Sequence, residues 1–355
     1  MVKPVRQEQE PATDQITEVG PGVLRLQLPI SMPGLGHVNC YAMEDDRGVA
    51  IVDPGMPGPE PWKALVARLN DAGFPLARVH SVIVTHSHPD HFGGAARIRE
   101  ETGADIITHE RFRVWWDPQE VDAEDPETDE AVAVPEGPWD RPLPWGGERG
   151  EDAMFSTTHR EEMRAHMRIP RPSKRLEDAQ VVTFAGREWV ALHTPGHTLD
   201  HLCLFDPAEG VVFSGDHVLP TITPHISGVD GAGDPLALFF DSLDRMTKLD
   251  GVTIALPAHG HPFHDLTGRV EAIKEHHDER LARLGAASAE IGRSASVREL
   301  MQSLFSELAW GWMAESETYA HLEHLRLNHE AESSWSDGLL RYEIAVSPRR
   351  QGSVA

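Results

Sequence analysis

Cysteine is scarce in this sequence. Among 355 residues only Cys40 and Cys203 are cysteines, and two cysteines do not make the disulfide framework typical of small secreted proteins. We therefore expect a cytoplasmic protein in which both thiols are reduced. Each cysteine is interpreted as a small buried side chain rather than as a reactive group.

Long hydrophobic runs are absent as well. The N-terminus up to Thr17 is polar and charged and has no apolar core of the kind that a signal peptide needs. No later stretch is long and apolar enough to cross a bilayer. We expect no membrane contact, and a disordered N-terminus over residues 1–14.

Basic residues are too few to balance the acidic ones. Lys and Arg total 32 against 57 Asp and Glu, so the formal net charge is -25. A field of this sign repels phosphate backbones, and nucleic acid is therefore not an expected partner. A small-molecule substrate is expected instead. The hydrophobic fraction of 40% is enough for a large core, in about two domains or in one domain with additions.

One short run is dense in histidine. Residues 85–91 read THSHPDH, directly after the apolar stretch Val82–Val84 and before Gly93 and Gly94. A β-branched run that ends in such a turn predicts a buried strand delivering side chains to a loop. Imidazole and carboxylate groups together suit a divalent metal such as zinc. A histidine-rich surface loop would explain one of these residues but not the arrangement.

Three later segments repeat the pattern of an apolar strand, a small turn and a polar ligand type. They are TPGHT at 194–198, SGDH at 214–217 and PAHG at 257–260. They contribute His197, Asp216 and His259. The simplest account is one sheet framework that presents metal ligands from four strand ends.

The four motifs in this order resemble those of the metallo-β-lactamase superfamily of metallo-hydrolases, over roughly residues 15–275. The resemblance implies an α/β fold, a four-layer αβ/βα sandwich with the metals at one edge of the sheets. It implies two divalent ions, zinc in the first place, with Mn²⁺ or Fe²⁺ as alternatives because the same ligands accept them. The implied ligand set is His86, His88 and His197 for one ion, Asp90, His91 and His259 for the other, and Asp216 as the bridge.

This site would be hydrolytic rather than redox-active. His88 stands where the flavodiiron oxygen reductases of the superfamily carry a carboxylate. A water shared by two ions has its pKa lowered to about 7, so a bridging hydroxide can attack a carbonyl or phosphorus centre. Asp90 and Asp216 are the expected catalytic residues, Asp216 as the bridge and Asp90 as a group that also orients the hydroxide. Asp53 either orients a ligand from outside or only forms a turn.

Other histidines near the motifs are expected to support the site or to fill the core rather than to bind metal. These are His193, His201, His217 and His225. His276 and His277, on a helix expected from Arg269 to about Leu284, are interpreted as structural or exposed.

Two segments depart from the alternation of strands and helices. Residues 111–178, rich in proline, tryptophan and acid, are interpreted as an insertion that forms a lid near the site. Its methionines either line an apolar pocket or form the core of the insertion. Residues 280–347 show helices and then a strand, which resembles the winged-helix tail of the LACTB2-like branch. Because this tail has little basic charge, we expect it to pack or to form a homodimer.

Four functions remain open at this point. The first is hydrolysis of a thioester, a lactone or a related activated ester, favoured by the acidic field and the apolar-rich insertion. The second is a phosphodiesterase or endoribonuclease, suggested by the tail. The third is a mononuclear iron dioxygenase using His86, His88 and His197, although such an enzyme would not need the other ligands. The fourth is a metal-dependent binding scaffold without activity.

Overall fold

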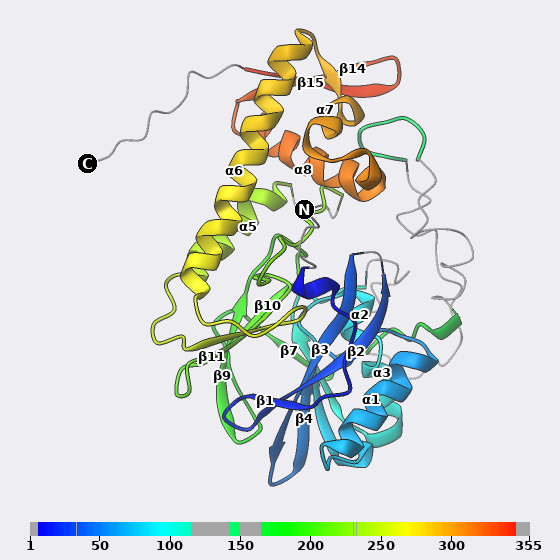
Figure 1. Cartoon of the computed structure of the whole chain (residues 1–355), viewed down its shortest axis with the longest axis vertical. Coiled ribbons are helices and arrows are strands. Elements are labelled where there is room, and N and C mark those ends of the chain that lie inside the picture. Colours follow the sequence, from blue (N-terminus) through cyan, green and yellow to red (C-terminus); the bar gives the residue numbers. More distant parts are fainter. Residues whose placement is uncertain are drawn as a thin grey trace, which may run out of the picture.

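Two β-sheets face each other in the lower part of the view in Figure 1, and helices cover their outer faces. The computed structural model describes residues 6–114, 142–149 and 165–345, apart from 33, 230 and 232. The seven-stranded sheet is antiparallel from β1 to β4 and parallel from β4 to β7. Its strands, in spatial order, are β1 (Thr17–Gly20), β2 (Val23–Met32), β3 (Leu35–Asp45), β4 (Gly48–Val52), β5 (Val79–Ile83), β6 (Asp105–His109) and β7 (Lys174–Leu176).

The second sheet has five strands in the order β12-β11-β10-β9-β8. Only the β11–β12 pair is parallel. The strands are β8 (Val181–Phe184), β9 (Arg187–His193), β10 (Leu202–Asp206), β11 (Val211–Gly215) and β12 (Ile254–Pro257). Strand β10 was not predicted from the sequence.

An aromatic core fills the space between the sheets. The ring of Phe213 lies 5.2 Å from that of Tyr41 and 4.9 Å from that of Trp189. On the outer face of the larger sheet, Leu65 and Ile98 pack from α1 (Pro59–Asp71) and α3 (Ala95–Thr102). Helices α5 (Pro235–Met246) and α6 (Leu266–Ile291) cover the other sheet. The structure therefore has the expected αβ/βα layering.

Two glycines separate the short helix of the histidine-rich run from the helix that follows it. The structure has the short helix α2 (Pro89–Phe92), then Gly93 and Gly94, and then α3. A Cβ atom on Gly93 would lie 2.1 Å from the backbone nitrogen of Pro57. Only glycine permits this approach, which draws the metal-ligand motif close to the chain that follows β4.

The prediction of a disordered segment over residues 1–14 is wrong for residues 6–14, whereas residues 1–5 lie outside the described part. The turn η1 (Gln7–Gln9) packs into the molecule, and the side chain of Glu8 is fully buried. Its carboxylate accepts hydrogen bonds from the backbone N–H groups of Thr221 and Ile222 and from the Thr221 hydroxyl. A charged segment can be ordered when its buried charge is hydrogen-bonded in this way.

The C-terminal elements form a second cluster of buried side chains. Helix α6, about 39 Å long, runs from the smaller sheet into this unit (Figure 1). The core of this C-terminal unit includes Leu300, Leu322 and Tyr342. The elements that follow α6 are β13 (Ala295–Ser296), α7 (Val297–Leu304), η5 (Glu307–Ala309), α8 (Trp312–Leu327), β14 (Ala331–Ser336) and β15 (Leu339–Ile344). Strands β13, β15 and β14 form a sheet, and the comparison with a winged helix stays a prediction.

Most of the predicted lid, residues 111–178, lies outside the described residues. Within the described part, Trp145 packs into the C-terminal unit and its Nε1 donates to Glu315 Oε2 at 2.9 Å. Met167 packs against the core of the larger sheet. Among the described residues, no helix has the length and hydrophobicity needed to span a membrane.

We expect Glu8→Gln to loosen the N-terminal segment, because an amide cannot accept the same charge-assisted hydrogen bonds. The expected loss is about 2 kcal/mol of stability. It would be measured as a lower Tm together with faster proteolysis before Thr17. The control is Glu18→Gln, because Glu18 is exposed and accepts one backbone N–H. Equal Tm and proteolysis rates for both variants would contradict the role of Glu8.

Candidate metal centre

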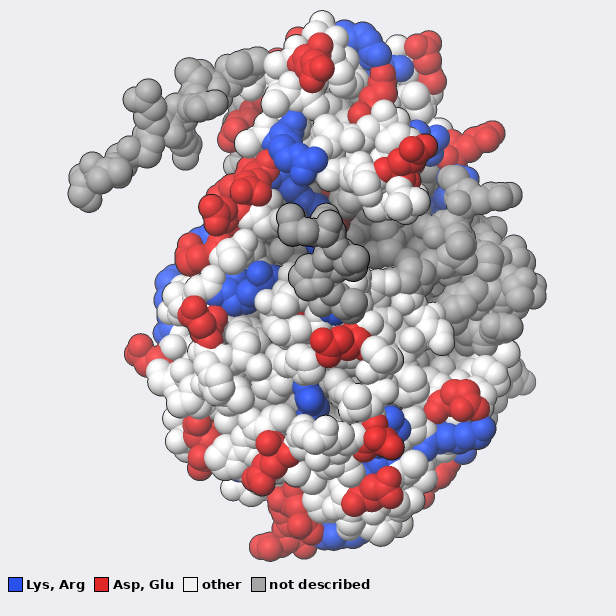
Figure 2. Space-filling model, viewed as in Figure 1, with Lys and Arg blue, Asp and Glu red and all other residues white. Residues whose placement is uncertain are grey.

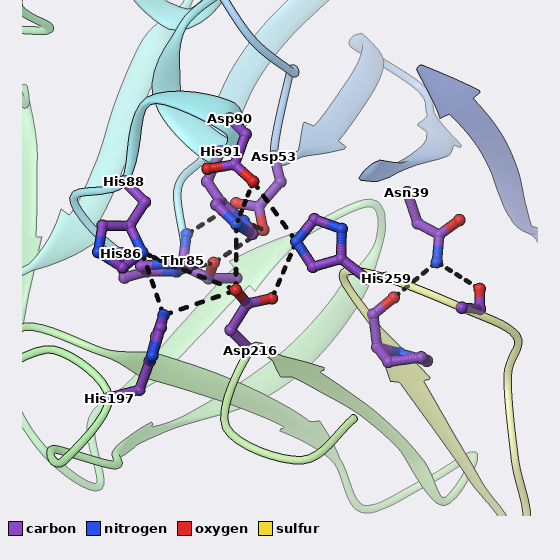
Figure 3. Close-up of polar contacts among 12 residues, drawn as sticks. Asn39, Asp53, Thr85, His86, His88, Asp90, His91, His197, Asp216 and His259 are labelled. Carbon is purple, nitrogen blue, oxygen red and sulfur yellow. Dashed lines mark hydrogen bonds and ion pairs between the residues drawn. The ribbon is translucent and has the colours of Figure 1, made fainter. Parts of the chain in front are cut away.

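All seven residues that the motifs singled out meet at one edge of the two sheets (Figure 3). Each arrives at the end of a strand or on the short helix that follows it. His86 and His88 follow β5, whereas Asp90 and His91 lie on α2. The later residues follow β9, β11 and β12 in turn: His197, Asp216 and His259.

The ligand atoms separate into two groups. One consists of His86, His88, His197 and Asp216, and the other of Asp90, His91 and His259. In the first group, Nδ1 of His88 lies 2.9 Å from Nε2 of His86 and 3.1 Å from Nε2 of His197. Within each group the ligand atoms lie within 4.8 Å of one another.

The carboxylate of Asp216 lies between the two groups. Its Oδ2 atom is 3.5 Å from Nε2 of His197 and 3.6 Å from Nε2 of His91. Its Oδ1 atom is 3.3 Å from Nε2 of His259. One carboxylate therefore faces histidines of both groups, as a bridging ligand would.

Hydrogen bonds from outside the cluster fix the orientation of the rings. Nδ1 of His197 donates to the carbonyl of His225 at 2.7 Å, and Nδ1 of His259 donates to the carbonyl of His37 at 2.6 Å. A carbonyl oxygen can only accept, so each of these nitrogens carries the proton. The Nε2 atom of each ring is thereby directed into the cluster, in the orientation that metal-binding histidines adopt.

Asp53 orients two further rings, those of His91 and His86. Its Oδ2 accepts from Nδ1 of His91 at 2.8 Å and from the Thr85 hydroxyl at 2.7 Å, and its Oδ1 accepts from the Thr85 N–H at 2.8 Å. Because the Thr85 hydroxyl is used as a donor, its oxygen accepts from Nδ1 of His86 at 3.1 Å. Asp53 has a φ of 53°. Asp53 therefore does both things considered from the sequence: it forms a turn, and its side chain orients rings of the cluster.

These atoms fit a pair of cations. Nε2 of His91, Nε2 of His259 and Oδ1 of Asp216 are buried, and none has a hydrogen-bond partner among the described residues. Nδ1 of His88 lies close to Nε2 of both His86 and His197. The rings of His86 and His197 carry their protons on Nδ1, so their Nε2 atoms present lone pairs to His88. A proton on Nδ1 of His88 could satisfy only one of these two nitrogens, so the other faces it without a hydrogen bond unless a cation lies between them.

Without the ions, charge within the cluster shifts the pKa values in opposite directions. Burial, with a contribution from His197, lowers the pKa of His88 to about 3. Burial also acts against protonation of His259, but Asp216 and Asp90 outweigh it and raise the pKa of His259 to about 10. The same carboxylates with Asp53 raise the pKa of His91. Protons on His91 and His259 thus balance the carboxylates in the metal-free protein.

Two residues hold the backbone of the bridging aspartate. Nε2 of His201 accepts the N–H of Asp216 at 3.1 Å. A Cβ atom on Gly215, whose φ is +50°, would lie 2.6 Å from the same nitrogen. This glycine permits the close approach that places Asp216. Of the other histidines considered, His193 stacks on His109 at 4.0 Å and His217 packs edge-on against Phe239.

Sequence reasoning missed the groups that support the site through their backbones. Asn39 donates from Nδ2 to the carbonyls of Pro257 at 2.8 Å and Gly260 at 2.9 Å, and so fixes the turn that carries His259. The signal available in the sequence was an asparagine, Asn39, within the largely apolar run that forms β3; its side chain is buried. The carbonyls of His37 and His225 have no such signal, because every residue has a carbonyl.

Comparison with known proteins agrees with this site. Residues 33–259, well over half of the chain, match the metallo-beta-lactamase superfamily. The chain belongs to the metallo-beta-lactamase superfamily. A superfamily member of known structure from Thermus thermophilus has a TM-score of 0.72 and 27% identity, covering 91% of this chain and 99% of that one. A beta-lactamase domain protein from Burkholderia ambifaria has a TM-score of 0.70 and 27% identity, covering 94% of this chain and 95% of that one.

Two further relatives match this chain over shorter stretches. Lactamase-like protein nscB of Aspergillus fumigatus is 36% identical over 108 residues, 30% of this chain and 30% of that protein. Hydroxyacylglutathione hydrolase of Pseudomonas aeruginosa is 26% identical over 190 residues, 52% of this chain and 49% of that protein. The chain therefore spans less than half of the length of these relatives.

We expect metal binding to release protons. His91 and His259 have raised pKa values in the metal-free protein, so an ion that binds their Nε2 atoms must displace a proton from each. Lowering the pH increases this competition, and the affinity for Zn²⁺ should fall from pH 8 to pH 6. Calorimetry in buffers of different ionisation enthalpy measures the release, expected to be about one proton or more per chain at pH 7. A release of zero would contradict this assignment.

Proposed function

We propose that this protein is a hydrolase that uses two divalent metal ions, with zinc as the preferred metal. The observation that carries the proposal is the position of Asp216 between two sets of buried ligands. His86, His88 and His197 would hold one ion, and Asp90, His91 and His259 the other. The predominance of imidazole ligands favours zinc, while Mn²⁺ and Fe²⁺ remain alternatives.

When bound, such ions would act as Lewis acids and would lower the pKa of a coordinated water to about 7. The protein provides the fixed geometry. Asp53 and the carbonyls of His37 and His225 hold the rings, and Asp216 is held by His201. Burial raises the pKa of Asp90, but the nearby charges of His91 and His259 outweigh it and lower this pKa in the metal-free protein. Asp90 is therefore available as an acceptor beside the reacting groups.

The substrate class we propose is a thioester, a lactone or a related activated ester. The similarity to hydroxyacylglutathione hydrolase supports this class. So does the charge, because acidic side chains are interspersed with Lys and Arg over the face in Figure 2, and its described residues form no broad basic surface. A small neutral or weakly charged acyl substrate fits such a surface better than an RNA strand does.

A phosphodiesterase or endoribonuclease is the second candidate. The C-terminal unit with its three-stranded sheet favours it, through the predicted resemblance to the LACTB2-like branch. The dioxygenase alternative is weaker, because a single iron on His86, His88 and His197 leaves the second ligand group without a role. The cytoplasmic setting, the homodimer and the absence of a nucleic-acid partner stay predictions.

Asp216→Asn should abolish turnover, because a neutral amide cannot bridge two cations as a carboxylate does. The expected loss in kcat is at least about 10³-fold, with reduced metal content by elemental analysis. Asp206→Asn is the control, because Asp206 is also buried but is not among the candidate ligands: it caps the turn after β10 and pairs with Arg187. Near-normal activity of Asp216→Asn would contradict the proposed bridge.

A substrate panel tests the ranking of the candidates. We expect the zinc-loaded protein to cleave acyl-CoA or acylglutathione thioesters or lactones faster than bis(p-nitrophenyl) phosphate or single-stranded RNA. The measurement is kcat/KM for each substrate at one metal concentration. Phosphodiester cleavage without thioester or lactone cleavage would reverse the ranking, and oxygen uptake with one iron per chain would favour the dioxygenase.

A further inference from the structure

Helix α8 buries polar side chains on more than one of its faces. The buried polar residues of this helix are Glu315, Ser316, Glu317, Thr318 and His321. Burying a carboxylate is costly unless it is paired and hydrogen-bonded. A helix with two buried glutamates therefore needs specific partners, and the partners of Glu317 lead to the metal centre.

The carboxylate of Glu317 lies between two side chains from other elements. Its Oε1 atom pairs with the guanidinium of Arg280 on α6. Its Oε2 atom lies 3.5 Å from Nδ1 of His225, in the segment between β11 and α5. Arg280 and His225 are both largely shielded from solvent, with side chains 13% and 17% exposed. Solvent therefore screens these two contacts only weakly.

His225 is also the residue whose carbonyl oxygen accepts the hydrogen bond from Nδ1 of His197. The side chain of His225 thus contacts α8 while its backbone orients a metal-binding ring. We propose that Glu317 is a positioning residue for the metal centre, acting through His225 on His197. The C-terminal unit would in this way set the geometry of the ion held by His86, His88 and His197.

The segment that contains His225 is fastened to α8 by its backbone as well. The N–H of Gly228 donates to the hydroxyl of Ser316 at 3.3 Å. A Cβ atom on Gly228 would lie 2.6 Å from Cδ1 of Tyr319 and 2.9 Å from the backbone nitrogen of Ala320. The segment lies directly on the helix, so a displacement of α8 would displace His225.

The other end of the same segment is fixed independently of α8. Arg269 donates to the carbonyls of Leu219 and Ile222, both at 2.6 Å, and Glu8 accepts the N–H groups of Thr221 and Ile222. The position of His225 therefore depends on α8 at one end, while the other end is held by α6 and the N-terminal turn. Changing Glu317 should move one end and leave the other in place.

Glu317 also lies near His277 and His321, and these three groups could in principle hold a third ion. The hydrogen bonds indicate otherwise. Nδ1 of His321 donates to the carbonyl of Glu317 at 2.7 Å, so its Nε2 is the acceptor for Nδ1 of His277 at 3.0 Å. With this tautomer the Nδ1 protons of His321 and His277 both have acceptors. The guanidinium of Arg280 already neutralises the carboxylate of Glu317, so these three groups do not need an ion.

The test compares Glu317→Gln with Glu315→Gln. Each carboxylate lies between two donors: Glu315 accepts from Arg298 at 2.8 Å and from Trp145 at 2.9 Å. In Glu317→Gln the amide oxygen would face Arg280, and the NH₂ group would then face His225 in place of an acceptor. Glu315→Gln makes the same chemical change on the same helix without touching His225.

The inference rests on the proposed two-metal centre, and its main readout is metal affinity rather than turnover. We expect Glu317→Gln to lower the affinity for one of two bound Co²⁺ or Zn²⁺ ions by about 10- to 100-fold, measured by chelator competition. We also expect it to change the absorption bands of bound Co²⁺. Glu315→Gln should keep the affinities and the bands of the wild type, although we expect both variants to unfold at a lower temperature. Combining Glu317→Gln with His225→Ala should weaken binding no further than the stronger single variant.

Wild-type affinity and Co²⁺ bands in Glu317→Gln, with a Tm loss equal to that of Glu315→Gln, would overturn the inference. So would a wild type with three ions of which Glu317→Gln loses one, because Glu317 would then be a ligand. A wild type that binds no divalent ion would instead overturn the proposed function. An activity panel that fails while the affinity difference holds would leave the positioning role intact.

Discussion

The convergence of imidazole nitrogens around His88, beside the carboxylate of Asp216, is the constraint on which the rest of the site depends. Nitrogen atoms 2.9 to 3.1 Å apart in a buried cluster repel one another unless a cation or a proton lies between them. The protein holds them in place by connecting each ring to a rigid strand end. Four strands from two sheets end at this edge, and the aromatic core around Trp189 and Phe213 keeps the sheets in register with each other.

The second requirement is control of ring orientation. Asp53 serves two rings at once, one directly and one through Thr85, and it does so from a left-handed backbone conformation. A non-glycine residue in that conformation costs about 1 kcal/mol or more. The three hydrogen bonds that its carboxylate accepts offset this cost. The turn is thus strained where it supports the metal-binding groups, which explains why an aspartate rather than a glycine follows β4.

The convergence of the seven candidate residues was predictable from the sequence because they are side chains in compact motifs. Strands β4 and β15 have an equally local signal, since each is a short β-branched or apolar run between turns. Strand β10 was missed because it follows the histidine motif without a separate turn signal. The first turns of α8, from Trp312, are harder to recognise, because Glu315 and Glu317 resemble surface residues in sequence. Their burial depends on partners from distant segments, which no local pattern encodes.

The polar contact face of α8 has a physical rationale. An apolar face would pack against the segment around His225 with many nearly equivalent registers, since dispersion contacts are weakly directional. Ion pairs and hydrogen bonds between buried groups tolerate only one register, because every other arrangement leaves a charge unpaired. The Arg280–Glu317–His225 contacts therefore define the position of His225 more sharply than apolar packing could. The ring of His197, one hydrogen bond away from His225, would need positional accuracy of this kind to hold a metal ion.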